Sequence, residues 1–242
     1  MNTFKVTYKP FGDKAILIEW EKKVDTAILN DMIDFKDSIM DCGHLELNDL
    51  VIGYHSLTLV FRKEIKDFDS IVSQLKKVHS FDVISKKRAK TLWKIPVCYD
   101  AKFGIDLAEM SQDKNISVEK IIRLHTEAVY TVFFIGFLPG FLYLGGLNEK
   151  LHTRRKSSPR LRVAKGAVAI GGSQTGVYPM ESPGGWNIIG NTPVSFFELG
   201  KEVPCFAKSG DGLRFYAVTE KEYSSIQRQI ASGSYQINKE FL

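Results

Sequence analysis

The sequence has few of the residues that form covalent cross-links or membrane spans. Its 242 residues include three cysteines, Cys42, Cys98 and Cys205, far apart and without a CxxC pair. An odd count without that spacing argues against a disulfide framework or a zinc knuckle, so we interpret them as reduced thiols. Gly136 and Pro139 interrupt the longest apolar run, well short of the ~20 residues that cross a bilayer. The N-terminal residues lack the apolar core of a signal peptide. We therefore expect a soluble, cytoplasmic protein with no membrane partner.

Several motifs of catalysis and binding are also missing. The histidines form neither HxH nor HExxH, so the sequence gives no support for a metal site. GxxxxG spacings begin at Gly166 and Gly171, but neither has the lysine of a Walker A loop, and no GxGxxG opens a helix. The net charge of +5, from 33 basic and 28 acidic residues, is mild and does not require a nucleic-acid partner. A nucleotide would have to bind through some other geometry.

Apolar periodicity predicts two domains. Residues 1–88 show the order strand, strand, helix, strand, strand, helix, which predicts a small two-layer α+β domain. Its first helix is predicted to begin after an Asp25 cap and to end at Gly43. The polar, basic run 85–91 resembles a linker. Residues 89–242 begin with a strand and two short helices, expected at 105–112 and after a Ser117 cap. They then become rich in short strands and glycine turns, typical of a sandwich or barrel, before a closing helix.

The candidate chemistry concentrates between Phe134 and Pro193, where glycines lie among arginine, glutamine, tyrosine and tryptophan. Such glycines form tight barrel turns or let a ligand approach the backbone, and both interpretations stay open. Arg155 and Arg160 either belong to a charged face exposed to solvent or together bind an anion such as a carboxylate or a phosphate. Trp186 either fills part of the core or provides a surface on which a ligand stacks. His125 borders a buried helix face, as a structural histidine or as a proton carrier facing the glycine-rich loops.

Taken in order, these segments resemble the allophanate hydrolase subunit 1 family over nearly the whole chain. That family includes the B subunits of bacterial 5-oxoprolinases and KipI-like inhibitors of sensor histidine kinases. The matching segments are Ile95-Pro-Val-Cys-Tyr, Asp106-Leu, Leu124-His, Gly136-Phe-x-Pro-Gly-Phe-x-Tyr-Leu, Arg155, Pro159-Arg, Gly166-x-Val-x-Ile, Gln174-Thr-Gly-x-Tyr-Pro, Ser182-Pro-Gly-Gly-Trp and Thr192-Pro.

The resemblance implies an α+β N-terminal domain followed by a mainly-β, cyclophilin-like barrel. It also implies one component of an ATP-dependent 5-oxoprolinase, which opens 5-oxo-L-proline to L-glutamate. The partners would be a homologous C subunit of the allophanate hydrolase subunit 2 type and an A subunit of the LamB/YcsF type. ATP would be shared with a partner, so we expect the chain to be inactive alone. The alternative is an inhibitor of a sensor histidine kinase.

The same resemblance implies the site residues, and no metal ligand is among them. The catalytic set is His125, Arg155, Arg160 and Gln174, and the substrate- or nucleotide-binding set is Tyr178, Trp186, Gly172 and Gly184. In this interpretation the arginines hold phosphoryl oxygens, Gln174 donates to the amide and His125 moves a proton. Asn191 stands where the family usually has arginine, which favours a third possibility, a binding module without catalysis, unless Arg154 compensates.

Overall fold

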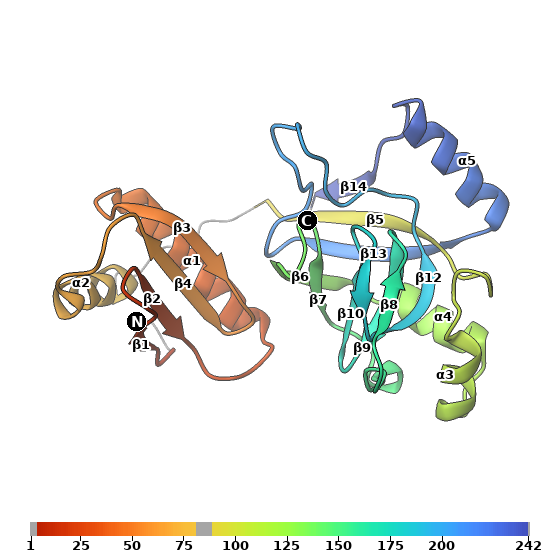
Figure 1. Cartoon of the computed structure of the whole chain (residues 1–242), viewed down its shortest axis with the longest axis horizontal. Coiled ribbons are helices and arrows are strands. Elements are labelled where there is room, and N and C mark those ends of the chain that lie inside the picture. The colour runs from red at the N-terminus through yellow and green to blue at the C-terminus, as the bar shows by residue number, and fades with distance from the viewer. Residues whose placement is uncertain (1–3, 81–88, 242) are drawn as a thin grey trace. The chain divides into compact units, whose positions relative to one another are not determined.

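The structure, a computed structural model, describes residues 4–80 and 89–241. The chain divides into two compact units, with the boundary between Arg88 and Ala89 (Figure 1). The junction predicted from the polar run at 85–91 falls largely outside the described residues.

The N-terminal unit has one antiparallel sheet and two helices. Its elements are β1 (Thr7–Pro10), β2 (Ala15–Glu19), α1 (Thr26–Cys42), β3 (Leu47–Ile52), β4 (Ser56–Phe61) and α2 (Phe68–Ser80). The strands lie in the order β1-β2-β4-β3, and α1 packs against α2 and β4. The apolar positions of α1 recur at helical spacing, which is why Ile28, Met32, Phe35 and Ile39 are all buried.

Local signals set the ends of α1 as the sequence predicts. The carboxylate of Asp25 accepts from the backbone N–H of Ala27 at 2.7 Å, which satisfies a donor that the first turn leaves free. Gly43 follows the last turn with φ 67°, a left-handed conformation that glycine adopts without strain. Both caps are therefore confirmed.

The second unit is a closed barrel with helices around it, and this part of the predicted fold is confirmed. Its strands are β5 (Thr91–Cys98), β6 (Tyr130–Ile135), β7 (Leu142–Gly145), β8 (Arg160–Val163), β9 (Ala167–Gly171), β10 (Gln174–Val177), β11 (Ser182–Gly184), β12 (Asn187–Asn191), β13 (Gly212–Val218) and β14 (Asn238–Phe241). The ring runs β12-β9-β10-β7-β6-β13-β5, and a pairing between Asn191 and Cys98 closes it. β8 and β11 pair in a separate two-stranded sheet.

Three helices belong to the barrel unit. They are α3 (Leu107–Lys114), α4 (Val118–Glu127) and α5 (Glu220–Ala231), with a single 3-10 turn at Glu149–Leu151. The predicted cap at Ser117 is confirmed, since its hydroxyl accepts from the N–H of Lys120 at 3.2 Å. α3 begins and ends two residues later than predicted, and Asn115, with a left-handed φ of 51°, follows its last turn. The carboxylate of Asp106 bonds to distant groups and does not cap the helix.

Candidate functional site

The wall of the barrel separates two apolar clusters. Val168 and Ile170 of β9 join the interior core, whereas Ala169 between them belongs to a second cluster outside the wall. We call this second cluster the outer face. Its buried members are Phe141, Val163, Ala167, Ala169, Tyr178, Trp186 and Ile188. The predicted site residues other than His125 lie in or beside the outer face.

Trp186 lies at the centre of the outer face. Its indole covers Gly171 so closely that a Cβ there would come within 2.5 Å of the ring. Trp186 is only 6% exposed, and the guanidinium of Arg155 lies over it, with Cζ 5.5 Å from the ring centroid. That Trp186 contacts a ligand stays a prediction: the indole is covered here, whereas the neighbouring Arg155 is exposed.

Tyr178 is also buried, with 2% of its surface exposed, and its position explains why residue 184 is a glycine. A Cβ on Gly184 would lie 2.2 Å from the Tyr178 hydroxyl oxygen, so glycine makes room for the phenol. Burial raises the pKa of the Tyr178 hydroxyl, which keeps it neutral near pH 7. The two residues therefore pack against each other, and their contacts with a ligand stay predictions.

A charged cluster borders the outer face, centred on the carboxylate of Asp106. This carboxylate is 2% exposed. It accepts from Nη2 of Arg160 at 2.6 Å and from the backbone N–H of Ile188 at 2.7 Å. Nζ of Lys156 lies 3.4 Å from it and also bonds to Glu109. Arg160 is therefore held in one orientation by a buried, charge-assisted hydrogen bond, with its side chain 29% exposed.

Gln174 lies on the outer side of the wall. It is the cross-strand partner of Gly171, the residue beneath Trp186, and its side chain is partly exposed. Gly172 follows Gly171 in the tight β9–β10 turn with φ 67°, and nothing lies within 4 Å of a Cβ placed there. The left-handed turn accounts for this glycine, and the open space beside it leaves the predicted approach of a ligand as a prediction.

His125 is on the other side of the wall, and this corrects the expectation that it faces the glycine-rich loops. The residue is fully buried in the barrel interior and stacks on Phe215 at 4.7 Å. Thr175 donates its hydroxyl proton to the carbonyl of Ala169, so it accepts from Nε2–H of His125 at 2.9 Å. Nδ1 consequently accepts from the hydroxyl of Tyr99 at 2.7 Å. Both ring nitrogens are engaged.

The protonation state of His125 follows from its burial. Burial lowers the pKa of His125 to about 3, so the imidazole is neutral near pH 7. A neutral, fully bonded ring inside the core has no solvent-exposed proton to exchange. The geometry thus supports a structural role for His125 and gives no support to proton transfer.

Two further residues have roles that the sequence does not reveal. In the sequence, Asp106 lies near the start of a predicted helix, and the matching segment Asp106-Leu points to no particular role. Asn191 is buried: its Oδ1 accepts from the hydroxyl of Tyr223 at 2.7 Å, and its Nδ2 donates to the carbonyl of Lys165 at 3.0 Å. Asn191 therefore ties α5 to the barrel.

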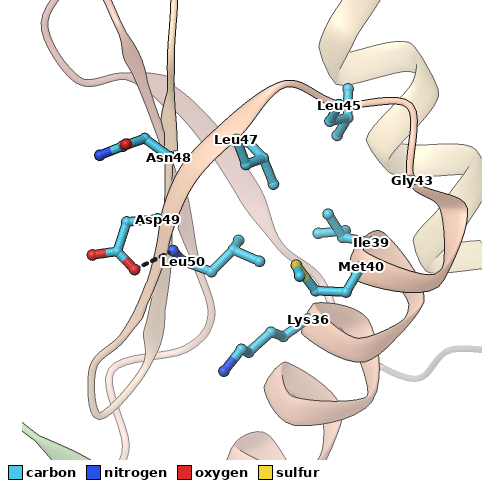
Figure 2. A pocket seen from close by; sticks show the side chains of 9 residues that line it. All are labelled: Lys36, Ile39, Met40, Gly43, Leu45, Leu47, Asn48, Asp49 and Leu50. Atoms are coloured by element: carbon cyan, nitrogen blue, oxygen red, sulfur yellow. Dashed lines mark hydrogen bonds between the residues drawn. The ribbon is translucent and has the colours of Figure 1, made fainter.

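A separate hollow of about 380 Å³ lies in the N-terminal unit, between the end of α1 and β3. Figure 2 shows Leu47 and Leu50 of the strand facing the helix across it, whereas Asn48 and Asp49 point away. Its lining residues are Lys36, Ile39, Met40, Gly43, Leu45, Leu47, Asn48, Asp49 and Leu50. Asp49 bonds the backbone N–H of Leu50 at 2.8 Å. None of the predicted site residues lines this hollow.

Within residues 4–80 and 89–241, no three His, Cys, Asp or Glu side chains gather as a metal ion would need. In the same residues, no helix combines the length and the apolar character required to cross a membrane.

The chain is similar to one described protein family and to several named proteins. The family described as carboxyltransferase domain, subdomain C and D, matches residues 6–207. The 5-oxoprolinase B subunit of Escherichia coli O157:H7 is 34% identical over 211 residues, 87% of this chain and 94% of that protein. The 5-oxoprolinase B subunit of Bacillus subtilis (strain 168) is 42% identical over 135 residues, 56% of each chain.

Among solved structures, the protein TTHA0988 superposes with a TM-score of 0.73 and 30% identity. The match covers 85% of this chain but only 40% of TTHA0988, so the chain corresponds to less than half of that longer protein. The matched segment of the family includes strands of both units and every residue of the outer face. The chain therefore belongs to the family of the carboxyltransferase domain, subdomain C and D, alongside the proteins named as B subunits of 5-oxoprolinase.

Proposed function

We propose that the chain is the B subunit of a cytoplasmic, ATP-dependent 5-oxoprolinase. Its partners are a homologous C subunit of the allophanate hydrolase subunit 2 type and an A subunit of the LamB/YcsF type. The observation that supports this most strongly is the alignment with the B subunit of E. coli O157:H7, which spans 87% of this chain and 94% of that protein. We also assign the barrel to the cyclophilin-like type.

The reaction sets clear demands on the residues. A cyclic amide is a stable electrophile, so its oxygen must become a better leaving group before water can open the ring. ATP, as a substrate, supplies the phosphoryl group for that oxygen. The transfer needs positive charge near the phosphoryl oxygens and fixed donors at the amide.

On the outer face, Arg155 and Gln174 fit these demands best. Arg155 is exposed, rests on Trp186, and has no acidic partner within salt-bridge distance in the described part of the chain. Its guanidinium suits a carboxylate or a phosphate, which it binds through two parallel hydrogen bonds. Gln174 offers an amide donor beside Gly171, on the same side of the barrel wall.

Two other cations of the site, Arg160 and Lys156, are already balanced by the carboxylates of Asp106 and Glu109. Arg154, beside Arg155, is exposed as well. Two adjacent arginines, in a sequence without a phosphate-binding loop, are too few to hold the polyphosphate of ATP. The residues fit one end of an anionic substrate, and this favours nucleotide contacts shared with the C subunit.

The test is reconstitution of the complex. The chain is co-expressed with candidate partners, a protein of the allophanate hydrolase subunit 2 type and one of the LamB/YcsF type, and glutamate release is measured with ATP and 5-oxoproline. We expect turnover from the assembled complex and none from the chain alone. Robust 5-oxoproline-dependent ATP hydrolysis by the chain alone would contradict the shared site. An assembled complex without turnover would contradict the enzyme role and favour the kinase-inhibitor alternative.

Site variants assign the residues within that complex. Arg155→Ala and Gln174→Ala should each lower turnover roughly ten- to hundredfold, since a hydrogen bond involving a charged group contributes about 1.5–3 kcal/mol. Arg162→Ala is the matched control, because Arg162 is an exposed arginine two residues from Arg160 that faces Glu181. Thermal melts recorded beside the assays distinguish a lost contact from a lost fold. Wild-type turnover in both site variants would show that Arg155 and Gln174 take no part in the reaction.

A further inference from the structure

The closure of the barrel leaves a gap at one end. Strands β5 and β12 pair only between Cys98 and Asn191. Towards its start, β5 pairs instead with β14, from Lys94 opposite Asn238 to Thr91 opposite Phe241 (Figure 1). The chain that follows β12 leaves the sheet at this point. The two walls of the barrel therefore diverge along the seam, and we call the hollow between them the seam groove.

The seam groove is large enough for a small organic molecule. Its volume is about 820 Å³, within the roughly 300–1,000 Å³ of typical ligand pockets. Its lining residues are Trp93, Lys165, Val194, Ser195, Glu198, Lys201, Ile230, Gly233, Tyr235, Gln236, Ile237 and Lys239. The segment after β12 supplies one wall and the segment entering β14 supplies the other. Barrel mouths are frequent ligand sites because the scaffold around them is rigid.

An anchored aromatic ring contributes to the lining. Trp93 packs on the edge of the interior core, and Phe206 meets its ring at 4.8 Å. Its indole N–H donates to Oδ2 of Asp211 at 2.9 Å, and Asp211 is only 1% exposed. The same carboxylate accepts from the backbone N–H groups of Thr91 and Lys208. The ring is thus fixed in place before any ligand arrives, which lowers the entropy lost on binding.

The charges of the groove are unbalanced. Lys165, Lys201 and Lys239 line it, against the single carboxylate of Glu198. Lys201 pairs with Glu198 at 2.8 Å. Lys239 lies against the rings of Trp93 and Phe241, 5.6 Å from each centroid, and no acidic side chain is within salt-bridge distance of Lys239 or Lys165 in residues 4–80 and 89–241. Two exposed ammonium groups therefore remain available to an anion.

We propose that the seam groove binds a small organic anion with a flat apolar part. The ammonium of Lys239, which lies over the Trp93 ring in the free protein, swings out to meet the anionic group beside Lys165. The flat part then takes its place against Trp93 and Ile237. The groove shares no residue with the outer face, so this site is distinct from the proposed 5-oxoproline site and does not depend on it.

The probe is 8-anilinonaphthalene-1-sulfonate, an aromatic monoanion whose fluorescence rises on binding. The full chain is titrated with it, and the same titration is made on the double variant Lys165→Gln/Lys239→Gln. We expect saturable binding to the wild type and a dissociation constant about tenfold higher in the variant. The matched control is Lys150→Gln/Lys221→Gln, which removes the same charge from two exposed lysines outside the groove. That control should bind as the wild type does.

A second probe separates charge from shape. N-phenyl-1-naphthylamine has the same rings without the sulfonate, so its affinity should be the same for the wild type and the groove variant. Equal weakening of both probes would overturn the role of the lysines. An unchanged dissociation constant for the sulfonate probe in the groove variant, or equal weakening in the control variant, would overturn the site. Absence of saturable binding up to millimolar probe would do so as well.

Discussion

Replacing His125 with glutamine should change how the stability of the barrel depends on pH. In the folded protein the pKa of His125 is about 3, against 6.5 for an ordinary histidine. Below pH 6.5 the unfolded chain therefore binds a proton that the folded state refuses, and folding stability falls as the pH falls. His125→Gln removes this titration and keeps a polar side chain of similar reach.

The size of this pH effect follows from the coupling between proton binding at His125 and folding. Each pH unit between the two pKa values costs about 1.4 kcal/mol per titrating group. Between pH 7.5 and 4.5 the wild type should thus lose about 3 kcal/mol of stability through His125, beyond losses shared with the variant. At pH 7.5 the variant should be less stable by about 1–3 kcal/mol, because the hydroxyl of Tyr99 loses its acceptor. The gap between the two proteins should therefore close, or reverse, by pH 4.5.

The assay is urea unfolding followed by tryptophan fluorescence in a Trp20→Phe background. Trp93 and Trp186 then report only the barrel unit, since both lie after residue 88. The other ionisable groups are common to both proteins, so they cancel in the difference. A gap that stays constant from pH 7.5 to 4.5 would refute the reasoning, because it would mean that the folded state does not hold His125 neutral.

Three further outcomes are expected. Gly184→Ala should lower the unfolding free energy by about 1–3 kcal/mol in urea titrations, because its Cβ would overlap Tyr178; wild-type stability would contradict the packing. Asp106→Ala should destabilise by about 3 kcal/mol, because it leaves Arg160 without its buried partner, whereas a stability change under 1 kcal/mol in the same titrations would contradict that. Limited trypsin digestion should cut first within 84–91 and leave a stable C-terminal fragment on a gel; uniform resistance there would contradict a linker.

Local chemistry allowed much of the fold to be predicted. Asp25 and Ser117 accept hydrogen bonds from backbone N–H groups two or three residues later, and Gly43 ends its helix by its own left-handed conformation. Because these partners are close in sequence, the sequence alone is enough to predict the caps. The alternation and glycine turns after residue 129 likewise indicate a sandwich or barrel, because strand periodicity is a property of neighbouring residues. The family resemblance brought Arg155, Gln174 and Trp186 into one candidate set, and the structure places them in or beside the outer face.

Only the tertiary structure decided what those residues can do. Asp106 binds Arg160 and the backbone of Ile188, which lie 54 and 82 residues further along the chain, and no local pattern predicts such partners. Helical spacing places His125 near a buried face but does not say on which side of the barrel wall. Burial, and with it the pKa of His125, depends on residues such as Thr175 that reach it only when the sheet closes. The sequence determined the elements and their ends, whereas packing between distant segments determined which polar groups are covered and which remain available to a ligand.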